Sequence, residues 1–162
     1  MSELEILYSP EEIDAAVRRL AQEINRDYQG KSPLLIGMLK GCFVFMADLV
    51  RHLEMPLEID FVQLSSYGRG RKESSGRVKT VQGLRTPVEG RDVIIVEDIV
   101  DTGITLDHVL SRLWKEKPSS VKICALFNKP ERREVTVPID YLGLRVPNVF
   151  IVGYGLDYDE KY

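Results

Sequence analysis

Short apolar runs alternate along the chain with amphipathic stretches, and this pattern predicts strands separated by helices. The β-branched residues 93–96 predict a strand buried on both faces, as in the middle of a parallel sheet. Further strands are predicted at 34–38, 57–64, 78–81, 121–127, 139–142 and 149–152. Helices are predicted from Pro10 to before Gly30, over 42–53 and from Leu106 to Trp114. Strands joined by helices of this length indicate an α/β fold with a mostly parallel sheet.

Polar side chains are concentrated directly after the predicted strand 93–96. Glu97 and Asp98 stand where this strand should end, and the loop Asp101-Thr102-Gly103-Ile104-Thr105 precedes the next helix. Ligands bind at the carboxyl ends of strands in open α/β sheets, and the free N–H groups of a helix N-terminus attract phosphate. A lone Asp-Thr-Gly would be better explained as part of an ordinary strand–loop–helix with a Thr cap. The full pattern favours a site for phosphate at the loop and for sugar hydroxyls or a hydrated metal ion at the acidic pair.

The strand followed by Glu-Asp and Asp-Thr-Gly-x-Thr closely resembles the phosphoribosyl-pyrophosphate-binding signature of the type I phosphoribosyltransferases. A second predicted strand–loop–helix carries Leu39-Lys40-Gly41 in its loop. This loop resembles the pyrophosphate loop of the purine phosphoribosyltransferases, although Lys40 alone is better explained as a solvated surface lysine. In that family the loop can contain a non-proline cis peptide, and either isomer is compatible with this sequence.

The sequence changes character between the predicted strands 57–64 and 78–81. Residues 65–79 hold three glycines, five cations and one acid. An interdomain linker is the alternative, but the chain is too short for two full domains. We predict a flexible active-site loop over about 65–80, whose positive charge suits a polyanionic substrate. Ser66 and Tyr67 resemble the tip of the loop that closes over the active site in this family and excludes water.

Two later segments supply candidates for binding a purine base. Phe150 offers a stacking face, and Ile151 offers backbone hydrogen-bonding groups. Lys129 can donate but not accept, which favours a 6-oxo over a 6-amino group. Taken separately, Phe150 is as well explained by core packing and Lys129 by solvation. Together, Phe127–Pro130 and 149–158 resemble the purine-recognition segments of the hypoxanthine-guanine phosphoribosyltransferases.

This resemblance implies a type I phosphoribosyltransferase fold in one domain over 1–162. That fold has a central, mostly parallel sheet flanked by helices, a small hood formed by the chain ends, and the flexible active-site loop. The resemblance also implies a purine-salvage enzyme that moves the 5-phosphoribosyl group from phosphoribosyl pyrophosphate to hypoxanthine or guanine. The products would be IMP or GMP and pyrophosphate, and the enzyme would assemble as a homodimer or homotetramer.

The same resemblance assigns roles to individual residues. Asp101 is implied as the general acid/base acting on N7 of the purine, and Mg²⁺ is implied as the cofactor. The expected metal ligands are Glu97, Asp98 and Asp157. Residues expected to bind substrate are Lys40, Gly41, Ser66, Tyr67, Glu97, Asp98, Asp101, Thr102, Gly103, Ile104, Thr105, Lys129, Phe150, Ile151 and Asp157.

Composition narrows the class of protein. With 44% hydrophobic and 29% charged residues the chain is expected to be globular, and a net charge of −3 does not suggest a nucleic-acid binder. No apolar run is long enough to span a membrane, and the first residues do not resemble a secretory signal. Cys42 and Cys124 lie far apart among apolar residues, so reduced thiols and a cytoplasmic location are expected.

Two other functions stay open from the sequence. One is a regulator with this fold that binds phosphoribosyl pyrophosphate or nucleotides and controls nucleic acid; a basic face outside the loop would favour it. The other is a phosphoribosyltransferase for a different base, against which Lys129 and Phe150 argue. One departure bears on activity, because the family usually continues past this tail to an arginine that contacts pyrophosphate. Here residues 159–162 come last, so that contact is expected either from a missing C-terminus or from elsewhere.

Overall fold

The computed structural model describes residues 5–66 and 78–156. Its elements are α1 (Pro10–Asp27), β1 (Leu34–Leu39), α2 (Phe43–Val50), β2 (Glu58–Ser66), β3 (Val78–Gln82), β4 (Asp92–Val100), α3 (Ile104–Trp114), β5 (Ser120–Asn128), the 3₁₀ turn η1 (Pro130–Arg132) and β6 (Tyr141–Arg145). Most of the predicted flexible loop over about 65–80 falls outside the described residues. No helix in the described ranges has the length and apolar character that a membrane span requires.

The described strands form one six-stranded sheet in the order β3-β2-β1-β4-β5-β6. The pairs β2–β1, β1–β4, β4–β5 and β5–β6 are parallel, and only β3 runs antiparallel, at the edge beside β2. The predicted α/β fold with a mostly parallel sheet is therefore confirmed. The strand predicted at 93–96 lies in the interior of the sheet as part of β4.

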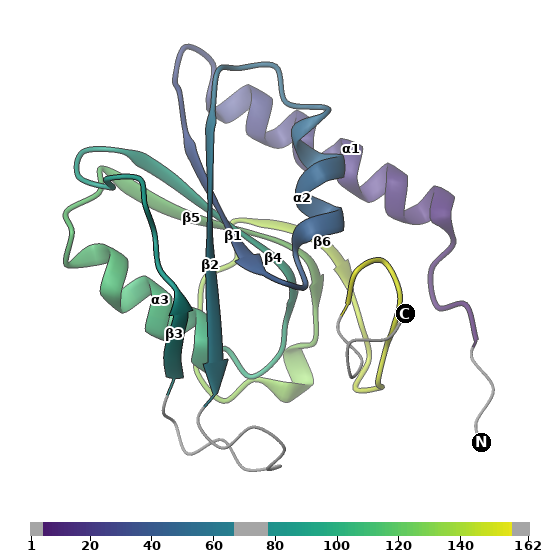
Figure 1. Cartoon of the computed structure of the whole chain (residues 1–162). Coiled ribbons are helices and arrows are strands. Elements are labelled where there is room, and N and C mark those ends of the chain that lie inside the picture. The colour runs from purple at the N-terminus through teal and green to yellow at the C-terminus, as the bar shows by residue number, and fades with distance from the viewer. Residues whose placement is uncertain (1–4, 67–77, 157–162) are drawn as a thin grey trace.

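Helices cover both faces of the sheet, α1 and α2 on one and α3 on the other (Figure 1). Because side chains alternate along a strand, β4 contributes to both cores. Ile94 and Val96 pack in the cluster that contains the buried residues of α1 and α2. Val93 and Ile95 pack in the cluster that contains those of α3.

The strand predicted at 149–152 is wrong, because the chain leaves the sheet after β6. Pro147 lacks a backbone N–H, and residues 153–155 all have positive φ, so this segment turns instead of extending the sheet. It folds back on α2, where the Tyr154 hydroxyl donates to the Asp48 carboxylate. A Cβ on Gly155 would lie 2.8 Å from Val44 of α2, so the approach is close.

The described ends of the chain lie on the same side of the molecule, next to β6 and α2 (Figure 1). Tyr8 stacks on Phe127 of β5 with ring centroids 6.1 Å apart, and its hydroxyl donates to the Arg145 carbonyl. The C-terminal segment lies against α2 beside them. This arrangement agrees with the predicted hood formed by the chain ends.

Candidate active site

The site is organised by the point at which β1 and β4 part. Their pairing extends only from Leu34↔Val93 to Gly37↔Val96, whereas β4 stays paired with β5 as far as Val100↔Asn128. From β1 the chain crosses to β2 through α2 on one face, and from β4 it crosses to β5 through α3 on the other. Such a switch point opens a crevice beyond the carboxyl ends of the two strands.

Glu97 and Asp98 lie within β4 and not after it. The prediction that the strand ends at this pair is wrong, because β5 continues to supply hydrogen-bonding partners to the backbone as far as Val100. Both carboxylates are partly buried at the parting of β1 and β4. They line the crevice together with Lys40 and Gly41 from the end of β1.

The loop that follows β4 is shaped by Gly103. Gly103 caps α3 with a φ of 87°, and a Cβ there would lie only 2.5 Å from the Val135 carbonyl oxygen. The Thr102 hydroxyl accepts a hydrogen bond from the Ile104 N–H at 3.3 Å. The predicted phosphate loop therefore sits at the N-terminus of α3, with its backbone packed against residues 133–135.

One cleft of about 400 Å³ gathers most of the predicted site. Its lining residues include Lys40, Gly41, Glu97, Asp98, Asp101, Thr102, Gly103, Thr105 and Arg132. Gly41 lies directly against Asp98, since a Cβ at this position would be 2.2 Å from the carboxylate oxygen. The Leu39–Lys40 peptide beside it is cis. Segments far apart in the sequence thus meet at one end of the sheet.

The acidic pair carries an unfavourable concentration of negative charge. Burial, followed by the nearby charge of Asp98, raises the pKa of Glu97 well above its usual value. Burial also raises the pKa of Asp98 to about 6, although hydrogen bonds from its own and the Ile99 backbone N–H groups oppose the shift. Burial and then the two carboxylates raise the pKa of the Cys42 thiol to about 12. A bound cation or hydroxyl donors at this point would relieve the repulsion.

Lys129 lies at the end of β5 and is buried, with only 6% of its surface exposed. Its Nζ lies 3.9 Å from Oδ1 of Asp101. The alternative that this lysine is solvated is therefore wrong, because its side chain extends from the end of β5 toward Asp101 in the predicted phosphate loop. Arg132 was not identified from the sequence, although a cation following Lys129-Pro130 at a strand end is the signal that indicates it.

Other predicted residues are not brought into the cleft. The side chain of Phe150 is 68% exposed, and Ile151 packs at the edge of the core, so neither lines the cleft. Ile104 begins α3 and contributes its backbone N–H to Thr102. Ser66 ends β2, and only its backbone is described. Tyr67 and Asp157 lie outside the described residues.

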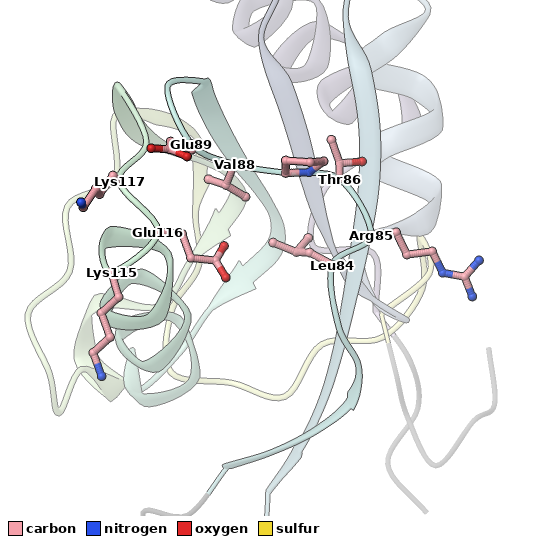
Figure 2. A pocket seen from close by; sticks show the side chains of 9 residues that line it. Leu84, Arg85, Thr86, Val88, Glu89, Lys115, Glu116 and Lys117 are labelled. Atoms are coloured by element: carbon pink, nitrogen blue, oxygen red, sulfur yellow. The ribbon is translucent and has the colours of Figure 1, made fainter.

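A second hollow, of about 540 Å³, lies between residues 84–89 and the C-terminal end of α3 (Figure 2). Leu84 and Val88 face the helix, whereas Arg85 points to the opposite side. This hollow is at the amino end of β4 and contains none of the predicted site residues. Among the described residues, the predicted site residues that line a cleft therefore all lie at the carboxyl end of the sheet.

The geometry agrees with comparisons to known proteins. The family model described as "Phosphoribosyl transferase domain" matches residues 4–159. The chain belongs to the phosphoribosyltransferase family. The family resemblance stated from the sequence motifs is thereby confirmed.

Individual members of the phosphoribosyltransferase family are similar to this chain over most of their length. The chain is 51% identical to the hypoxanthine-guanine phosphoribosyltransferase of Streptococcus thermophilus (strain CNRZ 1066), over 97% of this chain and 87% of the relative. It is 46% identical to the protein of the same name from Bacillus subtilis (strain 168), with the same coverage. The crystal structure of a hypoxanthine-guanine phosphoribosyltransferase from Bacillus anthracis superposes with a TM-score of 0.93 at 42% identity, over 99% of this chain and 94% of that one.

Proposed function

We propose that this phosphoribosyltransferase acts in purine salvage as a hypoxanthine-guanine phosphoribosyltransferase. It transfers the 5-phosphoribosyl group from phosphoribosyl pyrophosphate to hypoxanthine or guanine, giving IMP or GMP and pyrophosphate. The observation that carries this proposal is the cleft that joins the phosphate loop, the acidic pair and Lys40–Gly41 beside the buried Lys129. The relatives named above support the choice of base.

Phosphoribosyl pyrophosphate is assigned to the cleft at the parting of β1 and β4. Residues 101–105 bind the 5′-phosphate through the N-terminus of α3 and the hydroxyls of Thr102 and Thr105. Glu97 and Asp98 accept hydrogen bonds from the ribose hydroxyls and stabilise the positive charge that develops on the ribose. Lys40 and Gly41 hold the pyrophosphate.

We propose Mg²⁺ as the cofactor, held with the substrate's own oxygens by Glu97 and Asp98 and by Asp157. Within residues 5–66 and 78–156 no group of three or more Asp, Glu, His or Cys side chains is arranged to hold a metal ion by itself. The partly buried acidic pair nevertheless fits Mg²⁺, which is commonly bound by one or two carboxylates with substrate phosphates and water. When bound, Mg²⁺ neutralises the charge that develops on the departing pyrophosphate.

The base is assigned to the space next to Lys129 and Asp101. Lys129 donates to the 6-oxo group, and Phe150 and Ile151 supply stacking and backbone contacts once the base is bound. N9 of the purine forms its bond to C1′ as the bond from C1′ to pyrophosphate breaks, and the Asp101 carboxylate takes the proton from N7. Positioning of the two substrates supplies much of the rate acceleration.

We also propose a domain organisation, a cellular location and an assembly for the protein. Residues 1–162 form one domain, and the loop at about 65–80, with Ser66 and Tyr67, closes over the substrates. The protein works in the cytoplasm, which its two free, buried cysteines support. It assembles as a homodimer or homotetramer, which exposed apolar side chains such as Phe43 support.

The decisive test measures pyrophosphate release from phosphoribosyl pyrophosphate and Mg²⁺ with hypoxanthine, guanine, xanthine, adenine, orotate and uracil offered separately. Turnover with hypoxanthine or guanine is expected. Asp101→Asn should slow it by about 10²–10⁴-fold, the usual contribution of a general acid or base. Asp107→Asn, an exposed acidic residue in the first turn of α3, is the matched control and should retain activity. Turnover only with another base would contradict the assignment of the purine site, and binding of phosphoribosyl pyrophosphate without any turnover would favour a regulator.

A further inference from the structure

Residues 129–135, which we call the 129–135 strap, connect the two halves of the proposed site. At one end the Lys129 N–H donates to the Val100 carbonyl at 3.0 Å, and the lysine side chain lies next to Asp101. At the other end the N–H groups of Glu134 and Val135 both donate to the Thr102 carbonyl, at 2.9 and 3.0 Å. The strap therefore holds the residue assigned to the base and the backbone of the phosphate loop at once.

One side-chain hydrogen bond ties this strap to the end of β5. The Arg133 guanidinium donates through Nη2 to Oδ1 of Asn128, the last residue of β5. Asn128 is only 8% exposed, and its backbone carbonyl accepts from the Val146 N–H at 2.8 Å. Asn128 is thus fixed by β5 and by the start of the C-terminal segment, so it provides a firm anchor for Arg133.

The pair is poorly suited to a purely stabilising role. Nε of Arg133 is buried and has no hydrogen-bond partner among the described residues. A partly buried guanidinium with an unmet donor gains little stability relative to an apolar side chain of similar size. Cδ of Arg133 instead packs against Gly103, 3.2 Å from where a Cβ on residue 103 would stand. Arg133 therefore packs directly beneath the phosphate loop.

We propose that Asn128 and Arg133 are positioning residues that fix the 129–135 strap, and through it set Lys129 and the phosphate loop in register with each other. The proposal rests on the function proposed above and extends it to residues that do not line the cleft. Loss of the pair lets both ends of the strap shift, so binding of the base and of phosphoribosyl pyrophosphate weakens together. Even small misplacements of substrate-positioning groups are costly in catalysis.

The experiment compares Asn128→Ala, Arg133→Met and the double variant with the parent enzyme. Asn128→Ala changes no charge, so weaker binding of phosphoribosyl pyrophosphate in this variant cannot come from lost electrostatic attraction. Arg133→Met keeps the apolar stem of the side chain and removes its donors and its charge. Arg133→Lys retains a donor and the charge and tests for rescue. Glu131→Gln, an exposed residue of η1, is the matched control on the same strap.

Each single variant is expected to raise KM for both phosphoribosyl pyrophosphate and hypoxanthine by about tenfold, well within what a misplacement of 1 Å can cost. The double variant should be no worse than the more damaged single variant, since both remove one interaction. Arg133→Lys should recover part of the loss, and Glu131→Gln should match the parent. Melting temperatures should fall by only a few °C, because each single variant removes one hydrogen bond, whose net contribution to stability is about 1 kcal/mol.

Three results would overturn the proposal: multiplying effects in the double variant, a rise in KM for only one substrate, or lower melting temperatures with unchanged KM. Calorimetric titration with phosphoribosyl pyrophosphate and Mg²⁺ separates this proposal from the proposed function. If the parent binds phosphoribosyl pyrophosphate but turns over no purine, the function fails, and weaker binding by both single variants still supports the strap. A parent that binds neither substrate overturns both proposals.

Discussion

At the residue scale, the proposed phosphate loop, residues 101–105, depends on the absence of a side chain at Gly103. Its φ of 87° lies in the left-handed region, which costs other residues about 1–2 kcal/mol. A Cβ would also stand 2.5 Å from the Val135 carbonyl oxygen, a backbone atom that cannot simply rotate away. Backbone conformation and close packing therefore both select glycine at this position.

Replacement of Gly103 by alanine tests the two effects against each other. Gly90 is a matched control, because its φ is 73° and nothing lies within 4 Å of the place where a Cβ would stand. Gly90→Ala should lose about 1 kcal/mol of unfolding free energy, from strain alone. Gly103→Ala should lose about 1–3 kcal/mol more from overpacking, and most of its affinity for phosphoribosyl pyrophosphate. Urea unfolding measures the unfolding free energy, and calorimetry measures the affinity for phosphoribosyl pyrophosphate. Equal losses of unfolding free energy in the two variants would show that the close approach to Val135 does not matter.

At the scale of elements, α2 links the two parts of the proposed substrate site. It begins just after Lys40 and Gly41, and its Asp48 accepts the hydrogen bond from Tyr154 in the segment that carries the purine candidates. Burial, followed by this hydrogen bond to a carboxylate, raises the pKa of the Tyr154 hydroxyl, so it remains a donor throughout the physiological range. The helix thus anchors the C-terminal segment as well as covering the sheet.

Tyr154→Phe should release that segment and raise KM for hypoxanthine more than KM for phosphoribosyl pyrophosphate. Tyr141→Phe is the matched control, since its hydroxyl donates at 2.6 Å to Asp27, the last residue of α1, away from the cleft. Each change should lower the free energy of unfolding by about 1–3 kcal/mol, which is typical of a hydrogen bond to a charged group. Steady-state kinetics and thermal unfolding of both variants test the idea. It is refuted if the two variants change KM for hypoxanthine equally.

At the scale of the whole molecule, the acidic pair lowers the stability of the ligand-free protein, although it serves the proposed binding of substrate and Mg²⁺. The pKa of Glu97 is raised in the folded protein, so its contribution favours folding below the ordinary glutamate pKa and is lost as the pH rises through the raised value. Above the ordinary glutamate pKa the unfolded chain loses its proton more readily than the folded protein, so Glu97 destabilises the ligand-free protein at pH 8. Substrate and Mg²⁺ bound at the pair would reverse this cost.

Glu97→Gln should accordingly raise the melting temperature of the ligand-free protein at pH 8 by a few °C, and this gain should shrink as the pH falls toward about 4.3, the ordinary glutamate pKa. With Mg²⁺ and phosphoribosyl pyrophosphate at about 100 times Kd, the parent should gain about 2.7 kcal/mol, and EDTA should remove that gain. The variant should gain much less. Differential scanning calorimetry of parent and variant measures these changes at pH 8, at lower pH, with the ligands and with EDTA. A variant less stable than the parent at pH 8, or equally stabilised by the ligands, would contradict this account.

Most helices and strands were predictable because they depend on local patterns of residues. The apolar run 93–96 marked the inner strand, and the Asp101–Thr105 loop with its glycine marked the start of α3, where we propose that phosphate binds. The strand predicted at 149–152 failed for a tertiary reason, since β6 has no further parallel partner beyond it among the described strands and Tyr154 is drawn to α2. Apolar periodicity alone does not distinguish a strand from a segment that packs over a helix.

By itself the sequence determined the α/β class, the glycine loop before α3 and the acidic pair, because strand periodicity, glycine conformation and charge are properties of adjacent residues. Only the tertiary structure decided which segments meet. It brought Gly41 against Asp98, buried Lys129 beside Asp101, and joined Asn128 to Arg133 under the phosphate loop. These contacts depend on the order of strands in the sheet and on where β1 and β4 part. Burial and pairing of polar groups follow from that arrangement, which no local pattern specifies.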